Sequence, residues 1–159
     1  MTDADAEISV VPANEASWED LETVFGSRGQ ASRCQCQRYK LQPRESFASF
    51  PSEERAFRLR QQTDCGHRAS DTTDDSVWAV TCRFTRAGFR RRGVSRALAR
   101  AAVDFARERG ARAIEGYPMI TTDVILEELH VGTEGVFADA GFTEVSRPTL
   151  RRVVMRIDF

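Results

Sequence analysis

The stretch VWAVTCRFT-RAGFRRRG-VSRALARAAVDFARERG, Val77 to Gly110, decides the fold class expected for this chain. Its first nine residues, Val77–Thr85, are rich in valine, aromatic residues and threonine, which favours a β-strand. Arg86–Gly93 forms a basic, glycine-containing loop. The apolar residues that follow recur at the spacing of one helix face, and Gly110 is suited to end that helix in a left-handed conformation. The stretch therefore predicts a strand, a basic loop and an amphipathic helix, as in an α/β protein.

The loop and the first turn of the predicted helix suit the binding of an anion. The first N–H groups of a helix have no partner within it, and the helix dipole is positive at that end. A phosphate can accept those hydrogen bonds. Gly93 has no Cβ to block a close approach, and Ser95 is small and adds a hydroxyl. Positive charge that can fork onto a phosphate comes from Arg90, Arg91, Arg92 and Arg96.

The sequence from Arg90 to Ser95, R-x-x-G-x-S, resembles the pyrophosphate signature Q/R-x-x-G-x-G/A of the GNAT superfamily of N-acetyltransferases. Ser95 departs from the glycine or alanine usual in that family, but it is also small. Other runs are similar to one bacterial branch of the family or to the end of its last helix: C-Q-C-Q-R-Y at Cys34–Tyr39, E-G-Y-P at Glu115–Pro118, H-V-G-T at His130–Thr133 and A-D-A-G-F at Ala138–Phe142. The resemblance covers residues 77–159 well and residues 8–62 more loosely.

The resemblance implies a GNAT-like α/β fold, with an α+β mixed sheet, in a single domain over residues 1–159. It also implies an acetyl-CoA-dependent N-acetyltransferase, in which a small amine or a protein amine attacks the thioester directly. In the family the loop amides hold the pyrophosphate of coenzyme A. The preceding strand pairs with the pantetheine arm, and one of its amides polarises the thioester. The cofactor-binding residues implied here are Arg83, Phe84, Thr85, Arg90, Arg91, Arg92, Gly93, Val94, Ser95 and Arg96.

The catalytic side chain most familiar in this family is absent. The proton donor is usually a tyrosine four residues before the glycine of the G-F pair, and that position here is Phe137, which has no hydroxyl. Some members of the family use a bound water instead. Tyr117 and His130 are the candidate catalytic replacements, and Glu115 or Glu128 could act as the base. The alternative is structural: a core tyrosine, an ordinary loop histidine and solvated glutamates.

A β-hairpin that GNAT domains carry before the phosphate-loop strand is expected to be missing. Two strands and a turn need roughly 15 residues or more, and the polar stretch Thr63–Ser76 has no β-branched apolar run. We therefore expect a loop over residues 63–76 and a reduced sheet. Either Ile8–Val11 lies beside Val77–Thr85, or that strand has an exposed edge, which favours a homodimer.

The remaining elements follow from turn residues and apolar spacing. Residues 1–6 are expected to be disordered and Ile8–Val11 to form a short strand. Asn14 is a candidate cap for a first helix, Gly26–Arg33 interrupts that helix, and a second helix begins at Pro51. The expected later elements are a strand over Arg112–Tyr117, a helix over Thr133–Ala140, and strands over Phe142–Ser146 and Arg151–Asp158.

The composition limits the partners. The chain has 159 residues and a net charge of −1, which argues against general binding to nucleic acid or to an acidic membrane surface. No apolar run approaches the ~20 residues of a membrane span, and the acidic first residues lack the apolar region of a signal peptide. A cytoplasmic protein is therefore expected. Two alternatives to the enzyme stay open: a non-catalytic acyl-CoA-binding or interaction domain, and a nucleic-acid-binding surface along Arg86–Arg100.

The four cysteines are expected to be reduced thiols, as is usual inside cells. Cys34, Cys36, Cys65 and His67 could together form a zinc site, but their C-x-C and C-x-H spacings are tighter than the usual ones. No metal site is predicted for this reason. Cys82, on the predicted strand, is expected to be a buried small apolar residue.

Overall fold

The stretch Val77–Gly110 folds as a strand, a loop and a helix in the computed structural model of the chain, which describes residues 7–64, 74–120, 123 and 126–159. Strand β1 spans Val77–Val80, a 3-10 turn spans Ala87–Phe89, and helix α4 spans Val94–Glu108. Gly110 adopts a φ of +75°, the left-handed conformation expected just after a helix. The strand–loop–helix unit is therefore confirmed, although its strand is shorter than expected.

Four strands form one mixed sheet in the order β1-β2-β4-β3. Strand β2 spans Ala113–Gly116, β3 spans Thr143–Thr149 and β4 spans Arg152–Asp158. Strand β1 is parallel to β2, because α4 returns the chain to the same end of the sheet, and β4 is antiparallel to both β2 and β3. The chain is therefore a mixed α/β structure, as expected, and β1 lies at one edge of its sheet.

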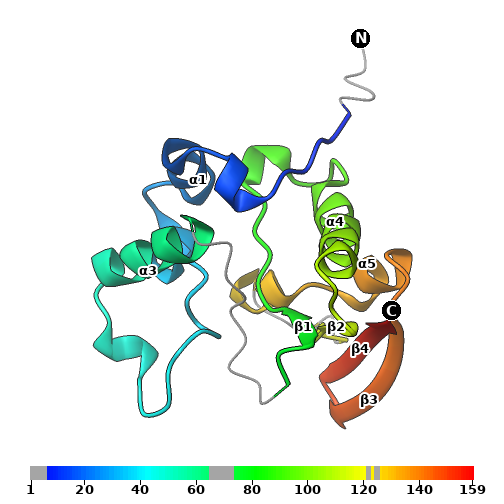
Figure 1. Cartoon of the computed structure of the whole chain (residues 1–159). Coiled ribbons are helices and arrows are strands. Elements are labelled where there is room, and N and C mark those ends of the chain that lie inside the picture. The colour runs from blue at the N-terminus through cyan, green and yellow to red at the C-terminus, as the bar shows by residue number, and fades with distance from the viewer. Residues whose placement is uncertain (1–6, 65–73, 121–122, 124–125) are drawn as a thin grey trace.

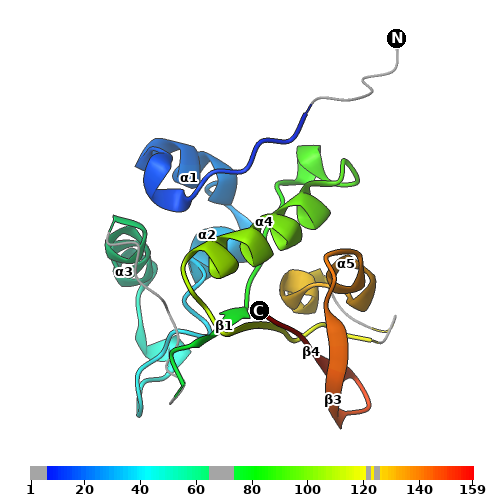
Figure 2. The ribbon, with the colours of Figure 1, turned by 45° about the vertical axis from the view of Figure 1, so that its right-hand side comes forward.

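The core lies between this sheet and two helices, α4 and α5, the second of which spans Glu134–Asp139. Both helices lie on the same face of the sheet (Figure 1, Figure 2). On that face, Val103 of α4 and Phe137 of α5 pack with Ile114 of β2 and Val153 of β4. The apolar stripe of the long helix and the short helix before Gly141 are thus both confirmed.

Three helices precede the sheet: α1 over Trp18–Phe25, α2 over Gly29–Cys34 and α3 over Ser52–Asp64. Ser17, rather than the expected Asn14, caps α1. Its hydroxyl accepts from the Asp20 amide, and the Asp20 carboxylate accepts from the Ser17 amide, so that two helix-end donors are satisfied at once. Helix α1 ends at Phe25, as expected from the interruption at Gly26–Arg33, and α2 begins at Gly29 inside that segment.

Helix α3 starts where the Pro51–Ser52 signal placed it, but it continues through Asp64. The loop expected from residue 63 therefore begins later. Residues 65–73 of that loop, and the expected disordered residues 1–6, lie outside the described ranges. Between α3 and β1 the described residues contain no strand, and β1 pairs with β2.

Two expectations about strands are wrong. Ile8–Val11 is not a strand, and Ile8 instead approaches the start of α4, where its Cδ1 lies 3.7 Å from the place of a Cβ on Gly93. Strand β1 ends at Val80 instead of Thr85. Val80 is in register with Gly116, and two residues further the neighbouring chain reaches Pro118, which has no N–H to continue the ladder.

The N-terminal helices contact the chain just beyond β1, residues 81–86. The rings of Phe25 and Phe84 stack with their centroids 6.2 Å apart, and Cys36 contacts Cys82. Helix η4, a 3-10 helix over Leu126–Val131, precedes α5, and two shorter 3-10 helices lie earlier in the chain, η1 over Ala13–Glu15 and η2 over Phe47–Ser49. In the described part of the chain, no helix has both the length and the apolar character needed to cross a membrane.

The close approach of β2 to α5 generates a stability prediction. A Cβ added to Gly116 would overlap the buried ring of Phe137, whereas a Cβ on the exposed helical Gly135 would meet nothing within 4 Å. We expect Gly116→Ala to lower the free energy of unfolding by about 1–3 kcal/mol through overpacking. Gly135→Ala should raise it by up to about 0.5–1 kcal/mol, because alanine loses less backbone entropy than glycine in a helix. Urea denaturation measures both, and equal stabilities would contradict this packing.

Candidate functional site

The loop before α4 presents a run of backbone amides at the start of the helix. Arg91 and Gly93 both adopt left-handed conformations, with φ of +60° and +82°. The amides of Arg96 and Ala97 donate to the carbonyl of Gly93. By contrast, the five consecutive amides of Arg91 to Ser95 have no acceptor within the described residues. Successive amides without internal acceptors can bind an anion, and anion binding by this loop remains a prediction.

The arginine side chains of the loop differ in how they are engaged. Arg91 and Arg92 are exposed, and the Arg92 guanidinium lies 5.7 Å from the centre of the Phe89 ring. Arg90 Nε donates to the carbonyl of Thr85 at 3.3 Å. Arg96, in the first turn of α4, forms an ion pair with Asp139 of α5 at 2.5 Å. The loop therefore keeps most of its positive charge at the surface, while Arg96 also joins two helices.

Beyond β1 and β2 the two chains diverge, and a third segment lies between them. The Arg83 amide donates to the carbonyl of His130 at 2.7 Å, and the Met119 amide donates to the carbonyl of Gly132 at 3.2 Å. Residues His130–Thr133 thus fill the wedge between the two diverging chains. The Arg83 amide, which was expected to face the cofactor, is engaged by the protein itself. The amides of Phe84 and Thr85 have no backbone acceptor within the described residues.

The side chain of Arg83 lies inside the same wedge. Its Nη1 donates to the carbonyl of Ser95 at 3.1 Å, and its guanidinium lies 4.7 Å from the centre of the Phe137 ring. Its Nε and Nη2 are buried, and neither has an acceptor among the described residues. Burial lowers the pKa of Arg83. Gly132, with a φ of +91°, leaves the room for this guanidinium, because a Cβ there would overlap Nη2.

Phe137, at the position of the family's usual tyrosine, is fully buried. Its ring meets Phe142 edge-on at 5.0 Å between centroids. The Arg83 guanidinium lies over the face of this ring. The negative face of the ring attracts the cation. The wedge therefore holds a positive charge near the position at which the resemblance to GNAT enzymes implies a phenol.

The structure brings His130 together with a residue that sequence analysis did not nominate. The hydroxyl of Tyr39 lies 2.8 Å from Nε2 of His130, and the two rings stack at 5.5 Å between centroids. Because the His130 carbonyl also accepts from Arg83, this pair borders the wedge. The available signal for Tyr39 was its place at the end of the C-Q-C-Q-R-Y run. A phenol bonded to an imidazole can move a proton.

The second nominated catalytic residue, Tyr117, lies elsewhere. Its hydroxyl donates to Glu115 at 2.7 Å, and the other Glu115 oxygen accepts from Arg156 at 2.8 Å. Side chains alternate along a strand, so Glu115 lies on the sheet face opposite to Ile114 and Gly116, which face the core. Burial, together with the bond to Glu115, raises the pKa of Tyr117 above its ordinary value. Tyr117 and Glu115 therefore form a structural network with Arg156.

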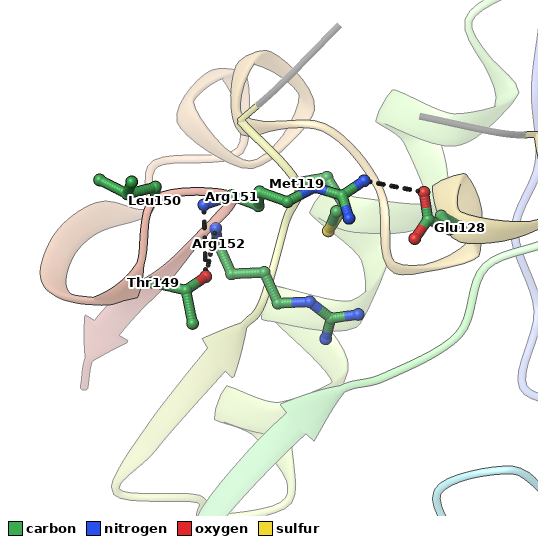
Figure 3. A pocket seen from close by; sticks show the side chains of 6 residues that line it. All are labelled: Met119, Glu128, Thr149, Leu150, Arg151 and Arg152. Atoms are coloured by element: carbon green, nitrogen blue, oxygen red, sulfur yellow. Dashed lines mark hydrogen bonds and ion pairs between the residues drawn. The ribbon is translucent and has the colours of Figure 1, made fainter. Parts of the chain in front are cut away.

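The remaining candidate base, Glu128, lies at a pocket of about 520 Å³. Its carboxylate pairs with Arg151 at 3.1 Å, as Figure 3 shows. The other lining residues are Met119, Thr149, Leu150 and Arg152. Two arginines against one glutamate give the pocket a net positive lining. Since the Met119 amide bonds to Gly132, this pocket adjoins the wedge, and its charge favours a group that is itself anionic.

No metal site is apparent in the described ranges. No group of three or more histidine, cysteine, aspartate or glutamate side chains there is arranged to hold an ion. Cys65 and His67, two of the four residues of the zinc set weighed from sequence, lie outside those ranges. The candidate site described above consists of the loop amides, the arginines and the Tyr39–His130 pair.

No protein-family model matches the chain, and neither a curated protein nor a solved structure shows significant similarity to it.

Two buried N–H groups of Arg83, at Nε and Nη2, lack hydrogen-bond acceptors among the described residues, and this leads to a stability prediction with a matched control. Replacing a buried charge by an apolar group of similar shape is often neutral or stabilising, so we expect Arg83→Met to raise the free energy of unfolding by about 1 kcal/mol or more. Arg55 is also buried, but its two terminal nitrogens donate to the carbonyls of Arg33 and Phe47. Arg55→Met should lower stability by about 1–3 kcal/mol, because the carbonyls of Arg33 and Phe47 lose their donors.

Chemical denaturation of the two variants beside the wild type separates these outcomes. A loss of stability in Arg83→Met equal to that in Arg55→Met would mean that the Arg83 guanidinium is fully hydrogen-bonded in solution. It would contradict the description of Nε and Nη2 as buried donors without acceptors in the described part of the chain.

Proposed function

We propose that the protein is an acetyl-CoA-dependent N-acetyltransferase of GNAT-like architecture, which transfers an acetyl group to an amine by direct attack. The observation that carries the proposal is the run of five unaccepted amides, Arg91 to Ser95, at the start of α4. These amides follow an edge strand that diverges from its parallel neighbour, and exposed arginines flank them. A pyrophosphate bearing two negative charges matches this arrangement of dipole, donors and guanidinium groups.

The residues divide into two groups by their proposed roles. The amides of residues 91–95 hold the pyrophosphate of the coenzyme, and Arg90, Arg91 and Arg92 neutralise its charge. The pantetheine arm follows residues 83–85, where the amides of Phe84 and Thr85 have no backbone acceptor within the described residues. For this arm to reach the wedge, the His130–Thr133 segment has to move, because it now bonds to Arg83 and Met119.

The Tyr39–His130 pair is proposed to handle the proton of the attacking amine. As the amine nitrogen bonds to the carbonyl carbon and the carbon–sulfur bond breaks, the nitrogen loses a proton to the phenol oxygen, which passes its own to the imidazole. The Arg83 guanidinium, placed over Phe137, stabilises the departing thiolate by its charge. The acceptor is a small amine or a protein amine, and the homodimer and cytoplasmic location remain predictions.

A second candidate function is a non-catalytic acyl-CoA-binding or interaction domain. The observation that favours it is the filled wedge, because the segment His130–Thr133 occupies the position proposed for the pantetheine arm. Phe137 in place of the usual tyrosine agrees with it. Both candidates bind coenzyme A, so turnover distinguishes them.

Binding is tested by calorimetric titration with acetyl-CoA. Gly93→Leu should weaken binding by about tenfold or more, equivalent to about 1.4 kcal/mol, because a side chain at this position blocks close approach to the amides. Gly110→Leu is the matched control: it lies just beyond the other end of α4, is also left-handed, and a Cβ there meets nothing within 4 Å. It should cost similar stability and leave binding unchanged. Equal affinity of both variants would refute the placement of the site.

Catalysis is tested by thiol release from acetyl-CoA across a panel of amines. We expect His130→Gln to lower kcat by about 100-fold or more, since general acid–base catalysis contributes that much. Tyr117→Phe is the control, because its hydroxyl serves Glu115, and it should keep kcat near that of the wild type. Binding without turnover of any amine would favour the non-catalytic candidate.

A further inference from the structure

Two cysteine side chains from distant segments meet beside the wedge. The sulfur atoms of Cys36 and Cys82 lie 3.6 Å apart. Cys36 follows the end of α2, and Cys82 lies in the extended chain after β1. Both are free thiols and both are partly exposed. Since a disulfide brings two sulfur atoms to about 2.05 Å, a small side-chain movement would join them.

The charges around the pair make the two thiols unequal. The side-chain hydrogen bond with Cys82 lowers the pKa of Cys36, and the ammonium of Lys40 acts in the same direction, while burial opposes both. The bond to Cys36 and burial raise the pKa of Cys82. Lys40 is itself partly buried, and its Nζ donates to Gln62 at 3.0 Å. Cys36 is therefore the thiol of the pair that ionises more readily.

The backbone holds Cys36 in an unusual conformation. Gln35 and Cys36 are consecutive non-glycine residues with φ of +50° and +55°, which is uncommon for side-chain-bearing residues. The next residue, Gln37, is buried. Its side-chain nitrogen Nε2 donates to the carbonyl of Gln35 and to the side-chain oxygen of Gln62. These contacts anchor the turn that directs Cys36 toward Cys82.

We propose that Cys36 and Cys82 form a redox-active dithiol site whose substrate is a hydroperoxide. The Cys36 thiolate attacks the terminal oxygen of the hydroperoxide, the oxygen–oxygen bond breaks, and the alcohol leaves after taking a proton. Cys36 then carries a sulfenic acid. The sulfur of Cys82 attacks the sulfur of Cys36, the sulfur–oxygen bond breaks, and water leaves with the proton of Cys82. The two sulfurs lose two electrons in total, and the hydroperoxide gains them.

The resulting disulfide would join the N-terminal helices to the chain after β1. Arg83 follows Cys82 directly, and its amide bonds to His130. Tyr39, which contacts His130, lies three residues after Cys36. The oxidation state of the dithiol therefore bears on the position of the Tyr39–His130 pair, whatever reaction that pair performs.

The reduced full-length protein is treated with one equivalent of hydrogen peroxide, free thiols are blocked with N-ethylmaleimide, and the digest is analysed by mass spectrometry without reduction. We expect a peptide pair crosslinked between Cys36 and Cys82, with Cys34 and Cys65 alkylated. A disulfide to Cys34 or Cys65 instead, or sulfinic acid on Cys36 without a crosslink, would overturn the proposal.

Three variants assign the roles within the pair. Cys82→Ser should accumulate sulfenic acid on Cys36, trapped by dimedone, because the second thiol is missing. Cys36→Ser should consume peroxide at least about tenfold more slowly than the wild type, since the thiolate is the nucleophile. Cys34→Ser is the matched control and should form the crosslink at the wild-type rate. If Cys36→Ser reacts as fast as the wild type, Cys36 is not the nucleophile and the proposal fails. The wild-type crosslink remains a test even if a variant does not fold.

Discussion

The burial of the Phe137 ring is the interaction on which much of this structure depends. The ring is fully buried between α4, the sheet and Phe142, and β2 accommodates it only because residue 116 is a glycine. Burying such a ring removes a large apolar surface from water. The same ring carries the guanidinium of Arg83 on its other side. One aromatic side chain thus links the apolar core to the polar wedge.

In the wedge, the apolar ring of Phe137 lies against the Arg83 guanidinium, two of whose nitrogens have no hydrogen-bond acceptor among the described residues. A guanidinium with buried N–H groups that lack acceptors carries an energetic cost, and the protein accepts that cost at the point where two parallel strands separate. The loop at the start of α4 adds five more amides without acceptors nearby. Donors gathered in this way are matched most simply by an anionic or carbonyl-bearing ligand. The electrostatic character of the site therefore comes from its backbone as much as from its arginines.

The N-terminal helices contribute side chains to this region that the strand–loop–helix unit does not contain. Phe25 stacks on Phe84, Tyr39 bonds to His130, and Cys36 approaches Cys82. Each contact joins an N-terminal residue to the chain beyond β1 or to η4. These contacts lie next to β1. GNAT domains carry a hairpin before this strand, and the described residues here contain none. The segment that follows α2 thereby brings a phenol, a thiol and an ammonium group close to the candidate site.

Local features of the fold and of the loop before α4 could be predicted because they depend on residues close together in sequence. The apolar spacing of α4, the left-handed Gly93 and Gly110, the arginine loop and the two closing strands all follow from propensity, periodicity and capping. The tertiary structure decided the rest. Strand β1 ends early because its neighbour reaches Pro118, and the Arg83 amide turns to His130 because a segment about 50 residues away in the chain enters the wedge. The Tyr39–His130 and Cys36–Cys82 pairs join residues far apart in sequence. Whether these side chains come into contact depends on how distant segments pack together, which a local sequence pattern does not determine.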